Sequence, residues 1–531
     1  MKFKNWVKEQ DFSSVDLVIV LGLGNKAERP SLLRERCDAK ILCFEPREHI
    51  RNRYSLVDNC LVSPNLISLR ARIKSSISDL EREVVLVDDS EDHKDLGIEN
   101  IEEIHQMYHE AVIMGLSRDT ASLKFAGQRV SHMLSSMDIL IKYPPINNLI
   151  NVFHDLPGLI VGAGPSLDKN IELIKENQDK FIIAAVNSSL PALHKAGIVP
   201  DFCVVCEAKP IAETIKDVDT IPEIVMIPGI HVNRETWELP WLRKAPALSL
   251  EGIFGQWATK TLEVYPIPIG SSCVTLAAGT LQLLGCNPLV LVGCDCAPAE
   301  TGEMYSSGAA FAGTTVEHTD NGTIMTKSES KLLVDNQSLD NPFTHMDTVR
   351  VLNWDKSKKI ETMLVYDSIR QWFEEMSLTW KDNTLINSTE GGVFINNWES
   401  KKLEDVVKDI SGMEFDSKKL ICDNLDNLPV ITKEKILKAF DEQIDSAEYI
   451  GDLAREGIAL MERAREIQVL ITEAKGGELL DAKCWGDIEL ARKDKDRPAF
   501  EVFKLMFQAI EKGSVELSSE LRETRKTIDD N

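Results

Sequence analysis

The sequence predicts an α/β fold class: a Rossmann-like N-terminal domain, a central doubly wound α/β domain and a C-terminal α-helical domain. Three observations predict it. Apolar runs of strand length alternate with helical patterns over residues 1–100, and the alternation returns over 156–399. Over 400–531, apolar residues recur every three or four positions among dense mixed charge, as in long packed helices. Residues 101–155 have a mainly helical pattern and are expected to connect the first two domains.

The length of the chain indicates how many domains it has, and its charge indicates which partners it excludes. A chain of 531 residues is long enough for three or four domains. Lys and Arg number 60 and Asp and Glu 85, a net charge of −25, which repels phosphate backbones and anionic membranes. The opening "MKFKNWVKEQDFSS" lacks the apolar core of a signal peptide, and no window is apolar enough to span a membrane. We expect a soluble cytoplasmic protein without nucleic-acid partners.

Cysteine and histidine pairs offer weak metal signals. Cys203 and Cys206 form a CxxC and Cys294 and Cys296 a CxC, but all four lie in β-branched runs without zinc-loop character. His105 and His109 are one helical turn apart, and an exposed helix face is the commoner arrangement. We therefore expect buried thiols of a reducing compartment and no metal site.

The first domain opens with a glycine turn. In "VDLVIVLGLGNKA", residues 15–27, an apolar strand is followed by Gly22, Gly24 and Ala27, which fit G-x-G-x-x-A. Glu45 ends the next strand, "AKILCFEP", where a ribose-binding acid would lie, and "REVVLVDDS" predicts a further strand. Pro30 lies early in the following helix and indicates a longer loop. A structural turn is favoured over dinucleotide or adenosylmethionine binding.

The central domain opens with a second glycine turn, "LIVGAGPSLDKN". Gly162 and Gly164 permit a tight turn and close backbone approach, Pro165 suits a first helical turn, and the Ser166 hydroxyl can meet a phosphate at the helix start. The spacing is not that of a Walker loop. The pattern predicts an anion site made by geometry, with a plain helix cap as the alternative.

Further polar residues follow the next predicted strands and helices of this domain. Asn187 and Glu207 end the runs "KFIIAAVN" and "DFCVVCEA", and Asp295 ends "PLVLVGCDC". A helix opens with "GSS", Gly270 to Ser272, and Tyr305 lies beyond Asp295. Since the carboxyl ends of parallel strands share one edge of a sheet, these residues predict a nucleotide site there.

Four segments carry a resemblance to a known family. They are "VGAGPSLDKN", "AGIVPDFCVVCEAKP", "GSSCVTLAAGTLQLLGCNPLVLVGCDC" and "INSTEGGVFI". They resemble the motility accessory factor (Maf) flagellin glycosyltransferases, whose three-part layout is also similar. That family in turn resembles bacterial sialyltransferases, which bind CMP-sialic acid through a similar turn.

The resemblance implies transfer of a nonulosonic acid, of pseudaminic or legionaminic type, from a CMP donor to Ser or Thr of flagellin, for flagellar assembly and motility. It implies that the turn cradles the donor phosphate, through Gly162, Ala163, Gly164, Pro165 and Ser166. It also implies that a further set of residues contacts the ribose, base, sugar carboxylate or phosphate of the donor: Asn187, Glu207, Gly270, Ser271, Ser272, Asp295 and Tyr305. Where the sialyltransferases have asparagine, this chain has Glu207.

The reaction also needs a base for the attacking hydroxyl. The candidates are Glu390 in "STEGG" and His318 in "GTTVEHTDNG", with His345 in "NPFTHMDTV" as a further histidine. No cofactor is expected to be required, although Mg²⁺ is compatible with a nucleotide donor.

Two alternatives remain. The central domain also resembles archaeal hydroxymethylpterin pyrophosphokinases, and under that interpretation Glu207 and Asp295 would hold Mg²⁺ for transfer from ATP. The third interpretation is a flagellin-binding assembly factor without activity, whose long C-terminal helices cover a partner helix.

Overall fold

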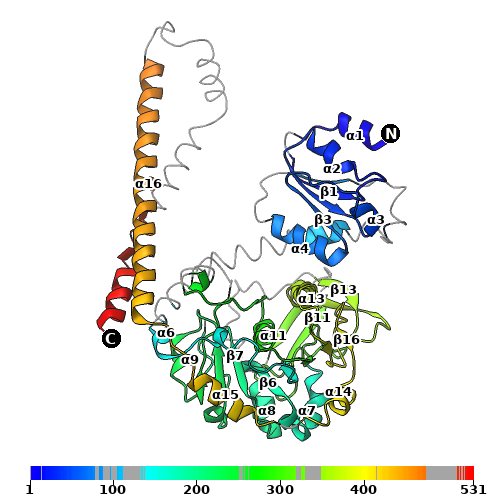
Figure 1. Cartoon of the computed structure of the whole chain (residues 1–531), viewed down its shortest axis with the longest axis vertical. Helices are drawn as coiled ribbons and strands as arrows, with labels where there is room; N and C mark the ends of the chain where they lie inside the picture. Colours follow the sequence, from blue (N-terminus) through cyan, green and yellow to red (C-terminus); the bar gives the residue numbers. More distant parts are fainter. Residues whose placement is uncertain are drawn as a thin grey trace.

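The computed structural model describes most of the chain. The described residues are 2–12, 15–77, 83–87, 96, 104–111, 132, 136, 138–207, 209–249, 255, 258–260, 262–318, 324–328, 348–413, 415–473, 511–512, 515, 518–519 and 521–530. Within them the fold is α/β with two parallel sheets and a helical C-terminal part, as the sequence predicts (Figure 1).

The N-terminal unit is a four-stranded parallel sheet in the order β3-β2-β1-β4. Its elements are α1 Lys2–Glu9, β1 Val15–Leu21, α2 Arg29–Arg34, β2 Lys40–Phe44, α3 Glu48–Arg51, β3 Cys60–Ser63, α4 Leu66–Ile77 and β4 Glu83–Val87. Central β1 has apolar side chains on both faces, with Val18 and Val20 in one core and Leu17 and Ile19 in the other. Helices cover both faces, as a parallel sheet requires.

The central unit is built on an eight-stranded sheet in the order β16-β15-β10-β5-β6-β7-β8-β9, in which all pairs are parallel. Its strands are β5 Gly158–Val161, β6 Ile182–Val186, β7 Phe202–Val205, β8 Val225–Pro228, β9 Arg243–Lys244, β10 Leu289–Val292, β15 Leu385–Asn387 and β16 Glu399–Ser400. The apolar runs of strand length predicted over 156–399 are confirmed, and they form β5, β6, β7, β8 and β10.

Helices pack on both faces of this sheet. They are α7 Leu167–Glu176, α8 Leu190–Ala196, α9 Arg234–Glu238, α11 Cys273–Leu283, α13 Leu364–Ser377, α14 Leu403–Asp409 and α15 Ser417–Asp426, with 3₁₀ turns η3 Gln178–Lys180, η4 Asn187–Ser189 and η5 Ile221–Glu223. Along β5, Ile160 points into one core while Leu159 and Val161 point into the other. This alternation explains why every residue of the run is apolar.

The strand order reverses beside β5. The chain runs from β5 outward through β6, β7 and β8 to β9, then returns to place β10 on the other side of β5. The helix after β5, α7, packs in one core, and α13, which follows β10, packs in the other. Open α/β sheets bind ligands at such a reversal, beyond the carboxyl ends of the strands.

Two antiparallel hairpins are inserted between β10 and α13. They are β11 Thr314–His318 with β12 Ile324–Ser328, and β13 Thr348–Leu352 with β14 Lys359–Met363. Helix α6 Ile139–Lys142 and the 3₁₀ turn η2 Ile146–Asn148 precede β5. Ile146 and Phe153 enter the central core before the predicted domain start at 156, and Ile421 enters it beyond 400. The domain boundaries remain predictions.

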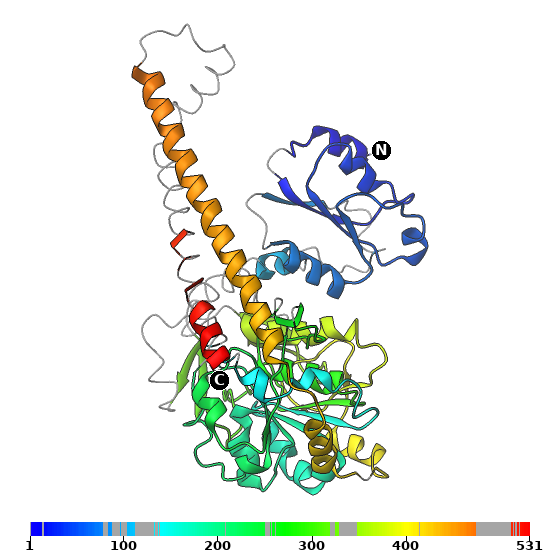
Figure 2. The ribbon, with the colours of Figure 1, turned by 60° about the vertical axis from the view of Figure 1, so that its left-hand side comes forward.

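The C-terminal part is dominated by α16, Lys433–Glu473, which projects from the central unit (Figures 1 and 2). The final described helix, residues 521–530, packs along its first half, with Leu521 and Ile528 against Ile436, Phe440 and Ile444. Among the described residues, no helix is long and apolar enough to cross a membrane.

Candidate functional site

The turn between β5 and α7 lies at the strand-order reversal. The N–H of Gly162 donates to the Val292 carbonyl at 2.9 Å, and that of Gly164 to the Gly293 carbonyl at 2.8 Å. The Ser166 N–H donates to Asp295 Oδ1 at 3.2 Å and its hydroxyl to Oδ2 at 2.8 Å. These donors of the predicted phosphate cradle therefore bind acceptors of the chain itself, so phosphate binding at Ser166 requires Asp295 to turn away.

Asp295 is enclosed on several sides. It is 5% exposed, and burial raises the pKa of its carboxyl to about 7 against the hydrogen bonds from Ser166, which lower it. A Cβ on Gly164 would overlap this carboxylate, and one on Gly392 would overlap the Asp295 backbone carbonyl. Only glycine fits at either position. The predicted turn and the predicted acid thus form one interlocked group.

The "STEGG" segment closes the same group. The Lys169 ammonium on α7 donates to the Glu390 carbonyl at 2.7 Å, and Asn170 donates to the Ser388 carbonyl at 3.1 Å. Val393 N–H donates to the Asp295 carbonyl at 2.9 Å. The segments of three separate motifs therefore meet at the end of β5.

The two candidate bases are placed differently. Glu390 has φ +53°, and its Oε1 accepts the N–H of Leu403 at 3.1 Å, at the first turn of α14. This contact gives the Glu390 carboxylate a capping role. His318 ends β11, paired with Ile324 of β12. His345 lies outside the described residues. Which of them accepts a proton remains a prediction.

A second polar cluster lies beyond β6 and β7. Asn187 directly follows β6 and is 1% exposed, and the half-buried Glu207 lies two residues beyond β7. The Cys273 thiol lies 3.6 Å from Glu207 Oε2 and 3.9 Å from Asn187 Oδ1. Cys206 N–H also donates to Glu207 Oε2, at 3.3 Å. Sequence analysis missed Cys273, although it directly follows the "GSS" motif.

The "GSS" loop opens α11 next to this cluster. Gly270 N–H donates to Thr275 Oγ1 at 2.8 Å, and Ser272 stands at the N-cap of α11 with extended backbone angles. Exposed Ser271 shares a hydrogen bond with Ser368 of α13, 3.0 Å between the hydroxyl oxygens. The loop is thus held between α11 and α13.

Tyr305 joins the two clusters. Burial raises the pKa of its hydroxyl, which forms a hydrogen bond with Tyr366, and Glu207 raises this pKa further through its charge. The next residue, Ser306, donates its N–H to the Ala163 carbonyl at 2.9 Å and its hydroxyl to Asp168 of α7. The loop after β10 therefore connects the glycine turn to α13, within reach of the Glu207 charge. The "PSLD" pattern of the motif was the available signal for Asp168.

Glu207 and Asp295 are the carboxylates of this site that could hold a metal ion. No cluster of three or more His, Cys, Asp or Glu with metal-binding geometry occurs within the described part of the chain. Glu207 Oε2 faces a thiol and an N–H, and the Asp295 oxygens face Ser166. Mg²⁺ prefers oxygen ligands, and both carboxylates offer them, but each already accepts hydrogen bonds from the chain itself. Binding of Mg²⁺ here remains a prediction.

The N-terminal glycine turn is also closed by an acid of its own chain. Gly22 and Gly24 both have φ +82°, and buried Glu45 accepts the Leu23 N–H at 3.0 Å while pairing with Arg47 at 2.8 Å. The chain then loops to α2, which starts at Arg29, as the position of Pro30 predicts. These contacts are those of a structural turn.

The histidine pair noted in the sequence lies on a helix surface, and three of the four paired cysteines are buried. His105 and His109 lie exposed on the helix 104–111. Cys203, Cys294 and Cys296 are buried, and burial raises the pKa of each thiol. They are core residues of the sheet.

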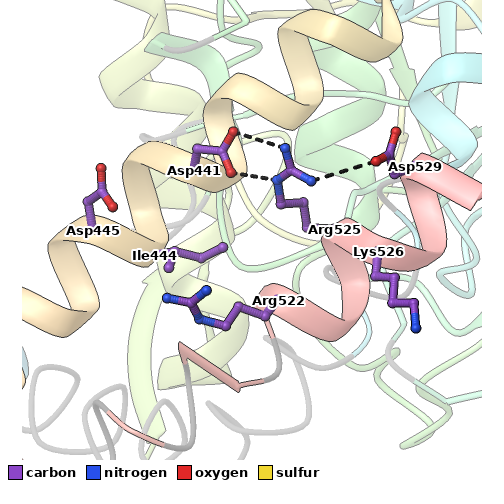
Figure 3. Close-up of a pocket in the computed structure, with 7 residues that line it drawn as sticks. All are labelled: Asp441, Ile444, Asp445, Arg522, Arg525, Lys526 and Asp529. Atoms are coloured by element: carbon purple, nitrogen blue, oxygen red, sulfur yellow. Dashed lines mark hydrogen bonds and ion pairs between the residues drawn. The ribbon is translucent and has the colours of Figure 1, made fainter.

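A pocket lies far from these strand ends, between α16 and the terminal helix (Figure 3). It has a volume of about 370 Å³ and is lined by Asp441, Ile444, Asp445, Arg522, Arg525, Lys526 and Asp529. Arg525 reaches across it to both Asp441 oxygens, at 2.5 and 3.2 Å. Paired charges fill its walls, so we place the candidate site at the sheet rather than here.

Comparison with known proteins supports the resemblance of the central part. Residues 131–301 match the family described as 6-hydroxymethylpterin diphosphokinase MptE-like. A protein of unknown function from Treponema pallidum (strain Nichols) is 38% identical over 56 residues, which cover 10% of this chain and 27% of that protein. The match thus spans about a quarter of that relative's length.

Among solved structures, the chain is similar to a Maf glycosyltransferase from Magnetospirillum magneticum AMB-1. The identity is 14% and the TM-score 0.41, over 99% of this chain and 82% of the other. That likeness is too distant to bear on function. The predicted resemblance of the central unit to the pterin diphosphokinase-like family is confirmed over residues 131–301.

Proposed function

We propose that the chain is a glycosyltransferase that moves a nonulosonic acid, of pseudaminic or legionaminic type, from a CMP-activated donor to Ser or Thr hydroxyls of flagellin. One observation carries the proposal. The motif segments that resemble the Maf family, up to about 230 residues apart, contact one another through Asp295, Lys169 and Cys273 at the strand-order reversal. This is the edge where an α/β sheet binds nucleotides.

In this proposal the phosphate of CMP lies at the start of α7. The Ser166 hydroxyl and N–H would bind it after Asp295 turns away, and the positive end of α7 favours an anion there. Because burial raises the pKa of Asp295 to about 7, part of these carboxyls is uncharged at neutral pH, which lowers the repulsion that an incoming phosphate meets. Both effects stabilise the departing CMP.

Glu207, Asn187 and the "GSS" loop would bind the cytidine or the sugar carboxylate. A cytosine amino group is a donor, and the Glu207 carboxylate would accept its hydrogen bond. Glu390 and His318 remain the proposed bases for the acceptor hydroxyl. We propose the cytoplasm as the site of the reaction, with flagellar assembly and motility as its purpose.

Binding of nucleotides to the full chain tests the proposal. We expect CMP and CDP to bind with or without Mg²⁺, more tightly than ATP and adenosylmethionine, in isothermal titration calorimetry. Glu207→Gln should weaken CMP binding about tenfold, the value of one hydrogen bond to a charged group. Glu213→Gln, an exposed change on the same segment, is the matched control and should bind as wild type. Equal binding by both variants would contradict the placement of the site.

The MptE-like match favours a second candidate, a pterin-type diphosphokinase. That function requires ATP and Mg²⁺, so tight ATP binding that depends on Mg²⁺ and an absence of cytidine selectivity would favour it. Transfer is checked directly by the mass of flagellin after incubation with a CMP-activated nonulosonic acid. Flagellin binding without a mass increase would favour the assembly factor instead.

A further inference from the structure

Helix α13 connects the N-terminal unit to the candidate site. The helix 104–111 and α4 belong to the N-terminal unit, and α4 lies against α13 (Figure 1). Arg70 of α4 forms an ion pair with Glu374 of α13, and Lys74 pairs with Glu375 at 2.9 Å. Arg70 is 8% exposed and Glu374 fully buried. The contact between the two units therefore runs through a buried charge pair.

Glu374 is the centre of a larger buried network. Besides Arg70, it accepts from Arg370 at 2.5 Å and from Asn396, at 3.1 Å from its N–H and 2.6 Å from its side chain. Arg370 also pairs with Asp367 at 2.5 Å. The two guanidinium groups of Arg70 and Arg370 thus face two carboxylates of α13. Loss of Arg70 would leave a buried negative charge in excess, which is strongly unfavourable.

Other residues of the same helix touch the candidate site. Ser368 shares a hydrogen bond with Ser271, 3.0 Å apart, and Tyr366 forms one with Tyr305. A Cβ on Gly270 would lie only 2.9 Å from the Trp372 ring, so the "GSS" loop rests directly on that ring.

Two of the site contacts, those of Ser368 and Trp372, lie on the side of α13 away from the buried charges. Successive residues of a helix are turned by about 100°, so 367, 370 and 374 share one side, while 368 and 372 lie roughly opposite. Just before the helix, Thr362 donates its hydroxyl to the Cys296 carbonyl at 2.6 Å, next to Asp295. A shift or rotation of α13 would therefore move the "GSS" loop, Tyr305 and the backbone beside Asp295 together, because packed helices move as rigid bodies.

We infer that the N-terminal unit positions the ligand site of the central unit through α13, and that Arg70 is a positioning residue for that site. The observations require no ligand in the N-terminal unit. The charged side chains of α4 pair with α13 and fix the position of α13 relative to the central sheet. The inference rests on the proposed ligand site at the "GSS" loop and Tyr305, and it extends that proposal to a residue about 200 positions earlier in the chain.

Hydrogen–deuterium exchange of the ligand-free full chain tests the coupling without any assumption about the ligand. Arg70→Met is compared with wild type, with Arg70→Lys, which keeps the charge, and with Arg36→Met. Arg36 is a control on the same unit, because it lies exposed and donates only weakly, at 3.4 Å, to the Lys8 carbonyl. We expect exchange in peptides covering 266–275 and 303–308 to rise about tenfold in Arg70→Met, within the usual range of coupling between sites.

The controls decide the outcome. Arg70→Lys should restore most of the protection, Arg36→Met should match wild type, and peptides from β5 and β6 should stay protected in every variant. Faster exchange confined to α4 and α13, or equal in Arg36→Met, would overturn the inference. Where Arg70→Met fails to fold, Lys74→Met, which removes the half-buried pair with Glu375, takes its place with the same expected pattern.

CMP titration of the same variants separates this inference from the proposed function. We expect the Kd of Arg70→Met for CMP to rise about tenfold, with recovery in Arg70→Lys. If wild type binds no cytidine nucleotide, the proposed function fails while the exchange data still decide the coupling. If wild type binds CMP and Arg70→Met binds it equally well, the coupling is overturned and the proposed function stands.

Discussion

Replacement of Asp295 by asparagine should change how stability depends on pH. The Asp295 carboxyl has a pKa of about 7 in the folded chain, raised by burial from 3.8. Between these values the folded state binds a proton that the unfolded state does not. The stabilising contribution of the protonated form is therefore fully present below about pH 4 and is lost as the pH rises through about 7.

The size of the effect follows from the separation of the two pKa values. About three units correspond to about 4 kcal/mol of unfolding free energy, an upper limit for one group. The asparagine of the variant would still accept from Ser166 through its amide oxygen, and it carries no charge at any pH. We expect the stability of Asp295→Asn relative to wild type to rise by about 2 to 3 kcal/mol between pH 5 and pH 8.

Urea unfolding followed by circular dichroism at pH 5, 6, 7 and 8 measures this difference. Other groups titrate equally in both chains, so the gap between variant and wild type isolates Asp295. Asp201→Asn is a positive control, because burial raises the Asp201 pKa to about 6, and exposed Asp179→Asn is a negative one. A gap for Asp295→Asn that is the same at pH 5 and pH 8 would refute the reasoning.

Three further outcomes are expected. Gly392→Ala should lower the unfolding free energy by about 3 kcal/mol, because φ is +67° and the methyl overlaps the Asp295 carbonyl, whereas Gly412→Ala, with open space around it, should be neutral in the same urea titration. Glu390→Ala should cost about 1 kcal/mol through the lost α14 contact, and Glu390→Gln should keep it. In the flagellin transfer assay, Glu390→Gln should lower kcat about a hundredfold or more while leaving CMP binding unchanged, and full activity would remove Glu390 as the base.

Much of the sheet architecture was predictable because its strands are continuous apolar runs. The runs that became β1, β2, β5, β6, β7, β8 and β10 have both faces buried, and few polar residues interrupt them. The two-residue edge strands of the central sheet were missed for the opposite reason. β9 consists of Arg243 and Lys244, and β16 of Glu399 and Ser400, whose polar side chains carry no apolar signal. Their backbone pairing alone defines them.

The candidate site was predictable residue by residue but not as an arrangement. The turn at Ser166 and the acid at Asp295 were both expected near a nucleotide. Their mutual hydrogen bonds depend on the strand order, which puts β10 directly beside β5 although about 130 residues separate them. Local pattern does not encode which strands are neighbours. The Arg70 to Glu374 pair was unpredictable for the same reason.

In each of the two sheets a carboxylate of the chain accepts a backbone N–H of the glycine turn: Glu45 accepts from Leu23 in one and Asp295 from Ser166 in the other. For the central sheet, a ligand at Ser166 must displace an internal anion rather than enter an empty cavity, so association there exchanges one negative group for another. Acidic solutions, which neutralise the internal carboxylate, should ease this exchange.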